Sequence, residues 1–149
     1  MNKELVDQMI SIIDDVDDMT IATVREDGFP QATTVSYIND GLTIYFLTSA
    51  DSQKARNIAR NNKVSLTIDR DYNSWHDIEG LSMGALAFFV TDPDEREKIG
   101  NLLLKKFPEV AQFDQGDFPD PAYIRIEPKV ISLLDYKKGF GHTELVNLS

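Results

Sequence analysis

The sequence contains no cysteine, which excludes disulfide bonds, thiolate catalysis and cysteine-ligated metal sites together. Histidine is almost as scarce, with only His76 and His142 in the chain. A multi-histidine metal centre therefore has too few ligands. We expect no metal site, and no side chain is singled out as a catalytic acid, base or nucleophile.

Long apolar runs are also missing, since no segment reaches the roughly 18 apolar residues of a membrane span. The N-terminus is acidic and lacks the apolar stretch of a secretion signal. We therefore expect a cytoplasmic protein with no membrane association. Basic residues are few, with 15 Lys and Arg against 25 Asp and Glu, for a net charge of −10. Nucleic acids repel such a polyanion and are not expected as partners.

Several nucleotide and hydrolase motifs are absent as well. The chain has no Gly-x-Gly-x-x-Gly after a strand and no Gly-Lys-Ser/Thr phosphate loop, which argues against dinucleotide folds and nucleoside triphosphatases. It also lacks the Gly-x-Ser-x-Gly turn of the α/β-hydrolases. What remains is a chain of 149 residues with 42% hydrophobic and 27% charged residues, typical of one globular domain, residues 1–149.

Hydrophobic spacing predicts a mainly β protein with flanking helices. Helices are expected at 3–16, 52–62 and 92–107, the last opened by a capping box of Asp92, Pro93 and Glu95. Strands are expected at 19–26, 31–38, 42–48, 63–69, 77–90, 122–128 and 129–136, the last two separated by Pro128, and the tail 137–149 is expected to be irregular. The short links favour a small, six- to seven-stranded antiparallel Greek-key barrel.

The junction between the third strand and the second helix has an unusual composition. In YFLTSADSQKARNI, residues 45–58, the hydroxyls of Thr48, Ser49 and Ser52 are followed by Lys54 in the first helical turn. A helix N-terminus already carries a partial positive charge, so a lysine there is mildly unfavourable by itself. Either an anion such as phosphate binds at this point, or Lys54 is simply solvated beside an ordinary cap. The residues alone leave both interpretations open.

Motifs along residues 19–142 resemble the flavin-binding split-barrel family that includes the pyridoxamine 5'-phosphate oxidases and the general stress protein 26 group. The pattern comprises a Gly-x-Pro turn at Gly28 and Pro30, an aromatic strand at 45–46, then Thr-x-x-x-Ser-x-Lys and an asparagine, here Asn57. IEGLSMGALAFFVTDPDE matches a later strand and helix start of the family. The ending YIRIEPKVISLLDYKKGFGH is similar to that of the stress-protein branch.

The resemblance implies a homodimer that holds flavin mononucleotide (FMN) at the interface of its two chains. By position, Thr48, Ser52 and Lys54 would bind the phosphate, with Ser49 and Gln53 adjacent. Strand residues Thr33, Thr34 and Val35 would line the isoalloxazine ring, largely through backbone groups. The oxidases carry arginine where this chain has Gln53, which implies weaker cofactor binding unless Arg56 or the partner chain compensates. Further candidates for contact with the flavin are Trp75, Phe140 and His142.

The resemblance also bears on chemistry. The true oxidases end in an arginine-rich segment, whereas no arginine follows Arg125 here, so we do not expect a pyridoxamine phosphate oxidase. A flavin-dependent oxidoreductase with a small-molecule redox substrate is the first expectation. The alternatives are a non-catalytic flavin carrier or sensor, or a protein that binds deazaflavin (F420) or haem, with His142 as the haem ligand. Trp75 has a second interpretation as a core or interface anchor.

Overall fold

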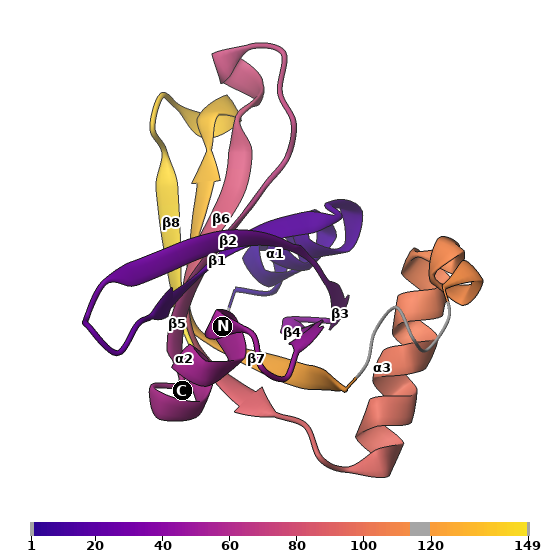
Figure 1. Ribbon diagram of the computed structural model, residues 1–149. Helices are drawn as coiled ribbons and strands as arrows, with labels where there is room; N and C mark the ends of the chain where they lie inside the picture. The colour runs from indigo at the N-terminus through magenta and orange to yellow at the C-terminus, as the bar shows by residue number, and fades with distance from the viewer. Residues whose placement is uncertain (1, 114–119, 149) are drawn as a thin grey trace.

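The computed structural model describes residues 2–113 and 120–148. Figure 1 shows a strongly curled sheet with helices around it. The α-helices are α1 (Lys3–Asp15), α2 (Gln53–Arg60) and α3 (Pro93–Lys106). The strands are β1 (Asp18–Val24), β2 (Pro30–Ser36), β3 (Ile38–Asp40), β4 (Thr43–Ser49), β5 (Lys63–Asp69), β6 (Glu79–Phe89), β7 (Pro121–Asp135) and β8 (Thr143–Asn147). The predicted class, a mainly β antiparallel split barrel with flanking helices, is confirmed.

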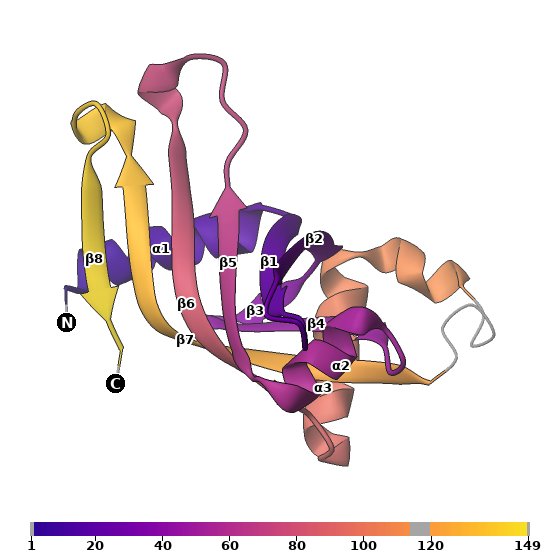
Figure 2. The ribbon, with the colours of Figure 1, turned by 60° about the vertical axis from the view of Figure 1, so that its left-hand side comes forward.

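The strands form one antiparallel sheet in the order β2-β1-β5-β6-β7-β4-β3, and β8 pairs with β7. Strand β7 organises this arrangement because it pairs with β6 along one edge and with two strands along the other. Its first half pairs with β4, from Pro121 to Ile126, and its second half pairs with β8, from Val130 to Leu134. Figure 2 shows the upper ends of β5 to β8 projecting beyond the rest of the barrel.

Strand β7 was predicted as two strands broken at Pro128, and this was wrong. The chain instead continues through a bulge, where Gly84 pairs with Val130 and the next residue, Ala85, pairs with Pro128. A proline cannot donate a ladder hydrogen bond, so a bulge is where a sheet accommodates it. At Gly84 the two strands approach closely, and a Cβ there would lie 3.2 Å from Cγ1 of Val130. The bend therefore curls the sheet without ending the strand.

Two further expectations differ from the structure. The strand predicted at 31–38 is divided, because Tyr37 separates β2, which pairs with β1, from β3, which pairs with β4. The phenol of Tyr37 is buried and donates to the carbonyl oxygen of Ile13 at 2.7 Å, so this residue anchors the turn between sheet partners. The tail predicted to be irregular contains β8, which the edge of β7 stabilises.

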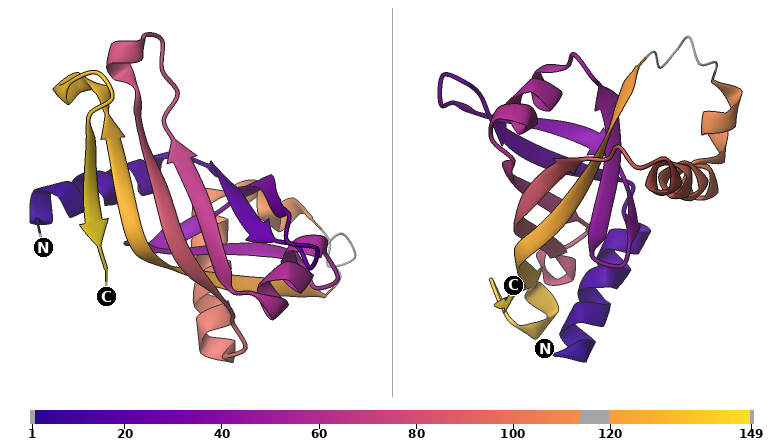
Figure 3. Two further views of the ribbon diagram at one scale, coloured as in Figure 1. Left: turned by 90° about the vertical axis from the view of Figure 1, so that its left-hand side faces the viewer. Right: turned by 90° about the horizontal axis from the view of Figure 1, so that it is seen from below.

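The core lies between α1 and the inner faces of the strands. Helix α1 runs across the strands in the left view of Figure 3 and buries Leu5, Met9, Ile12 and Ile13. In β5 every second residue is buried, as expected for a sheet with one face in the core. Within the described residues, no helix combines the length and apolar character that a membrane crossing requires.

Helix α3 packs outside the barrel, on a second apolar cluster of Ile38, Tyr45, Val90 and Ile99. Asp92 is its N-cap and accepts from the backbone N–H of Glu95 at 3.1 Å, as predicted. The capping box is not completed, because the Glu95 carboxylate accepts two hydrogen bonds from Nη1 of Arg125, at 2.8 and 2.9 Å. This ion pair attaches the start of α3 to β7.

Candidate functional site

The junction between β4 and α2 has the hydroxyl cap that the sequence indicated. Ser52 is the N-cap of α2, and its Oγ accepts from the backbone N–H of Ala55 at 3.1 Å. Thr48, near the end of β4, donates its hydroxyl to the same Oγ at 3.0 Å. Ser49 hydrogen bonds instead to the carboxylate of Asp51. Thr48 and Ser52 thus form one preorganised unit at the helix start, and Ser49 lies at its edge.

Lys54 lies in the first turn of α2 and is half-buried. Burial lowers the pKa of its ammonium group, and no charged neighbour among the described residues contributes an opposing effect. Charged side chains are rarely withdrawn from water without a partner, because desolvation disfavours the charged form. A bound anion would therefore give the ammonium group of Lys54 an oppositely charged partner.

Arg56 stabilises the same turn from its solvent side. Its guanidinium donates to the backbone oxygen of Asp51 at 2.8 Å and to Oε1 of Gln53 at 3.0 Å. Gln53 stands where the oxidases carry arginine, so Arg56 brings a guanidinium directly against that position. Compensation by Arg56 for the missing arginine stays a prediction.

Asn57 connects α2 to the first two strands. It is 1% exposed, accepts from Nε2 of Gln53 at 2.8 Å, and donates to Oγ1 of Thr23 at 2.9 Å and to Oε1 of Gln31 at 3.3 Å. A buried amide with its hydrogen bonds made fixes the position of the groups around it. Asn57 therefore sets the spacing between the start of α2 and strand β2.

Strand β2 presents alternate residues to this region. Thr33 and Val35 face inward and are partly buried, whereas Thr34 is exposed on the other face. The hydroxyl oxygen of Thr33 is buried and has no hydrogen-bond partner among the described residues. Such an orphaned polar atom is uncommon, and a ligand with a donor or acceptor would satisfy it. The side chain of Thr34 points away, so only its backbone could serve the same ligand.

The three remaining candidates lie far from this junction within one chain. Trp75 belongs to the short helix η1 (Trp75–Asp77), and Phe140 follows another, η4 (Tyr136–Lys138); their ring centroids are 6.0 Å apart. Both are strongly exposed, Trp75 at 66% and Phe140 at 80%. His142 follows them, with Nε2 3.8 Å from Oε1 of Glu144. In Figure 1 this tip is at the opposite end of the molecule from α2.

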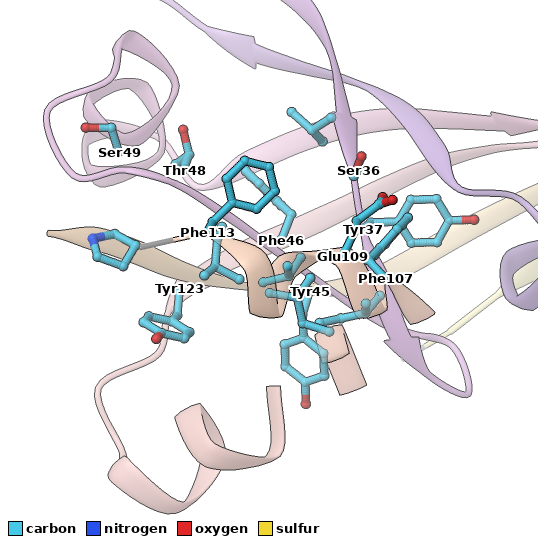
Figure 4. A pocket seen from close by; sticks show the side chains of 16 residues that line it. Ser36, Tyr37, Tyr45, Phe46, Thr48, Ser49, Phe107, Glu109, Phe113 and Tyr123 are labelled. Carbon is cyan, nitrogen blue, oxygen red and sulfur yellow. The ribbon is translucent and has the colours of Figure 1, made fainter. Parts of the chain in front are cut away.

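A cavity of about 670 Å³ opens beside the hydroxyl cap. It lies between β2, β3 and β4 on one side and α3 with the short helix η2 (Pro108–Gln112) on the other. Figure 4 shows Thr48 and Ser49 at one end of it and Tyr37 at the other, with Phe113 between them. Its lining residues are Val35, Ser36, Tyr37, Ile38, Tyr45, Phe46, Leu47, Thr48, Ser49, Leu103, Phe107, Glu109, Val110, Phe113, Pro121 and Tyr123.

The cavity joins Val35, Thr48 and Ser49, three of the predicted site residues, but none of its aromatic walls was predicted as part of a site. Of these aromatic residues, only the pair at 45–46 was noted in the sequence, because it belongs to the family pattern. Phe107 and Phe113 belong to a loop region whose position depends on how α3 packs, so no local spacing identifies them. Across residues 2–113 and 120–148, no three histidine or acidic side chains gather as a metal site would require.

The family model described as pyridoxamine 5'-phosphate oxidase matches residues 5–135. This chain belongs to that family. General stress protein 26 of Bacillus subtilis is 27% identical over 136 residues, covering 91% of this chain and 92% of that protein. A pyridoxine/pyridoxamine 5'-phosphate oxidase of Vibrio cholerae is 30% identical over 152 aligned residues, covering 83% and 68%. The match over nearly the whole length of both proteins places the chain with the general stress protein 26-like branch.

Solved structures confirm the family fold. General Stress Protein 26 from Bacillus anthracis superposes with a TM-score of 0.72 at 21% identity, covering 97% of this chain and 99% of that one. A heme binding protein from Mycobacterium smegmatis gives 0.77 at 16% identity, covering 95% of this chain and 56% of that one. Identities this low show a common fold, and one protein with this fold is named for heme binding.

Proposed function

We propose that this family member binds FMN at the junction of β4 and α2 and is a flavin-dependent oxidoreductase. The supporting observation is Lys54, a half-buried cation beside a preorganised hydroxyl cap, with no charged neighbour in the part of the chain that the structure describes. The phosphate would lie on Lys54, the free backbone N–H groups of α2 and the hydroxyls of Thr48 and Ser52. Charge-assisted hydrogen bonds of this kind are about twice as strong as neutral ones.

The ring system would extend from this phosphate toward β2. There the buried hydroxyl of Thr33 lacks a partner among the described residues, and Val35 offers an apolar surface. When bound, the flavin supplies hydride or electron transfer, and the protein supplies binding, orientation and electrostatics. Asn57 holds β2 and α2 at a set distance, so both ends of the cofactor would meet a rigid frame.

A second copy of the chain would complete the site. Trp75, Phe140 and His142 are too far from their own α2 to contact a flavin there, but an exposed tip can reach the site of a partner. We therefore include a homodimer in the proposed function, with FMN at its interface.

Oxidation of pyridoxamine 5'-phosphate is not part of the proposed function. That substrate carries a phosphate in addition to the phosphate of FMN, so it needs a second cationic binding site. The cations of the tail 137–149 are Lys137 and Lys138, and Lys138 already pairs with Glu144 at 3.0 Å. Lysines are flexible point charges and replace an arginine fork poorly. Incubating FMN-loaded protein with pyridoxamine 5'-phosphate should yield no multiple turnovers to pyridoxal 5'-phosphate.

Cofactor binding is tested with two ligands and two variants. Lys54→Ala should weaken FMN binding by roughly 1.5–3 kcal/mol, the range for hydrogen bonds to charged groups. Riboflavin, which lacks the phosphate, should bind the native protein and Lys54→Ala almost equally. Lys63→Ala, which removes an exposed lysine of β5, is the control and should leave FMN affinity unchanged. Equal FMN affinity of Lys54→Ala and the native protein in a titration would disprove the phosphate site.

Haem and F420 are the competing ligands, because the same fold occurs in a heme binding protein. The visible spectrum of the copurified ligand separates the three, as a flavin two-band profile, a deazaflavin single band or a Soret band. Haem would require an axial ligand, and His142 lies at the tip, beside Glu144. A Soret band that His142→Ala abolishes would replace FMN with haem.

A further inference from the structure

The cavity beside the hydroxyl cap is larger than the proposed phosphate site needs. Its volume of about 670 Å³ falls within the roughly 300–1,000 Å³ of small-molecule sites. It begins at Thr48 and Ser49 and extends to Tyr37 (Figure 4), with Glu109 and Val110 of η2 in its lining. A ligand placed there would therefore lie next to a flavin held at the start of α2.

Six of the 16 described lining residues are aromatic, namely Tyr37, Tyr45, Phe46, Phe107, Phe113 and Tyr123. Two of the phenols use their hydroxyls outside the cavity. Tyr37 donates to the carbonyl oxygen of Ile13 at 2.7 Å, and Tyr45 donates to Oε2 of Glu95 at 3.4 Å. Both tyrosines are almost fully buried, at 1% and 3% exposed, so the accessible ring surface of the lining belongs to Phe107, Phe113 and Tyr123. Ring surface favours a planar aromatic ligand, which gains both area burial and stacking geometry.

The charge around the cavity disfavours an anion. Glu109 is the charged residue in the described lining, and it is exposed at the rim. Three cations approach aromatic rings of the wall without lining the cavity, and each is engaged elsewhere: Lys106 with the carbonyl oxygen of Val16 at 2.7 Å, Lys98 with Asp40 at 2.6 Å, and Arg96 with the carbonyl oxygen of Val90 at 3.0 Å. An anion would lose its hydration without gaining a partner.

We propose that this cavity binds a planar, uncharged aromatic molecule of one or two fused rings, as the redox substrate of the protein. The assignment rests on the proposed function, because the substrate role requires a flavin beside the cavity. The proposed ligand differs from a phosphorylated substrate in charge as well as in shape. Specificity comes from apolar surface and from the absence of a cation among the described lining residues.

A matched pair of probes tests the charge preference. 2-Naphthalenemethanol is uncharged, and 2-naphthoate has nearly the same shape with a negative charge. Calorimetric titration of the FMN-loaded protein should give one equivalent of 2-naphthalenemethanol bound, with 2-naphthoate at least tenfold weaker. Equal or tighter binding of 2-naphthoate, or no binding of either probe, would overturn the assignment.

Two variants at one position test the location. Phe113 is 53% exposed, so its replacement should leave the fold intact, as a melting curve will verify. Phe113→Ala should weaken 2-naphthalenemethanol binding about five- to tenfold, and Phe113→Lys should shift the preference toward 2-naphthoate. Phe29→Ala removes an aromatic ring of similar exposure outside the cavity and should change neither affinity. Equal effects of Phe29→Ala and Phe113→Ala would contradict the assignment.

The same titrations separate this inference from the proposed function. If one equivalent of FMN displaces one equivalent of 2-naphthalenemethanol, the flavin ring itself binds in the cavity. The substrate assignment is then wrong. If FMN does not bind but 2-naphthalenemethanol still binds in a Phe113-dependent way, the flavin proposal fails and the aromatic ligand site is supported. Simultaneous binding of both ligands supports both conclusions.

Discussion

At the scale of single residues, Lys54 carries a charge that its surroundings disfavour. Burial lowers its pKa from the usual 10.5, so the folded protein binds this proton less tightly than the unfolded chain does. The charged lysine therefore destabilises the flavin-free protein at neutral pH. This cost disappears as the pH rises through the lowered pKa toward the value of the unfolded chain.

We predict that Lys54→Met raises the melting temperature of the flavin-free protein at pH 7, because it removes a charge from a partly buried position and keeps the aliphatic stem. The difference from the native protein should shrink as the pH approaches 10.5. With saturating FMN the order should reverse, since only the native protein gains the ionic contact. Lys63→Met, at an exposed position, is the control, and an equal rise in both variants would show that burial of Lys54 is unimportant.

At the scale of elements, α3 and η2 form one wall of the cavity, so its shape depends on how α3 begins and where it packs. The Asp92 cap and the contact between Arg125 and Glu95 both fix the first turn. Neither group lines the cavity. Substitutions in the first turn of α3 should therefore lower the free energy of unfolding directly. They should affect aromatic ligand binding only indirectly.

We predict that Asp92→Ala lowers the free energy of unfolding by about 1 kcal/mol, the typical cost of losing an N-cap. Asp94→Ala, in the same first turn, removes only an interaction with the helix dipole and should cost a few tenths of a kcal/mol. Urea unfolding of both variants measures the difference. Equal destabilisation would mean that the cap hydrogen bond of 3.1 Å contributes nothing beyond charge.

At the scale of the whole molecule, the projecting ends of β5 to β8 carry aromatic side chains that stay exposed among the described residues of one chain. Trp75 and Phe140 contact each other, but both remain strongly exposed. Figure 3 shows this end of the sheet extending beyond the barrel. A second copy that buried the tip would remove the exposed apolar surface and bring these side chains to its own β4–α2 junction, the proposed flavin site.

We predict a homodimer at micromolar concentration in analytical sedimentation, with an interface on the order of 2,000 Å² as in other obligate pairs. Combined Trp75→Ala and Phe140→Ala substitutions should weaken both dimerisation and FMN binding, since the proposed dimer uses the tip for both. Phe29→Ala, which removes another exposed ring, should change neither. A native monomer that binds FMN at full affinity would rule out a shared site.

Local chemistry in the sequence was sufficient for the three helices and most of the strands. Ser52 and Asp92 marked helix starts because a cap needs only a side chain and the next few N–H groups. Gly28 and Gly41 marked the turns before β2 and β4, and both adopt positive φ. The junction of Thr48, Ser52 and Lys54 was recognisable for the same reason, because all of its parts lie within seven consecutive residues.

Tertiary structure decided the features that depend on partners distant in the chain. Strand β8 exists because β7 offers it an edge, and β7 passes Pro128 without ending because the sheet takes up a bulge. Tyr37 divides a continuous alternating pattern because Ile13 of α1 accepts its hydroxyl. The aromatic cavity likewise has walls from four separate segments. The spacing of side chains along a helix or strand determines which of them share a face. Which residues that face contacts is determined only when the elements pack together.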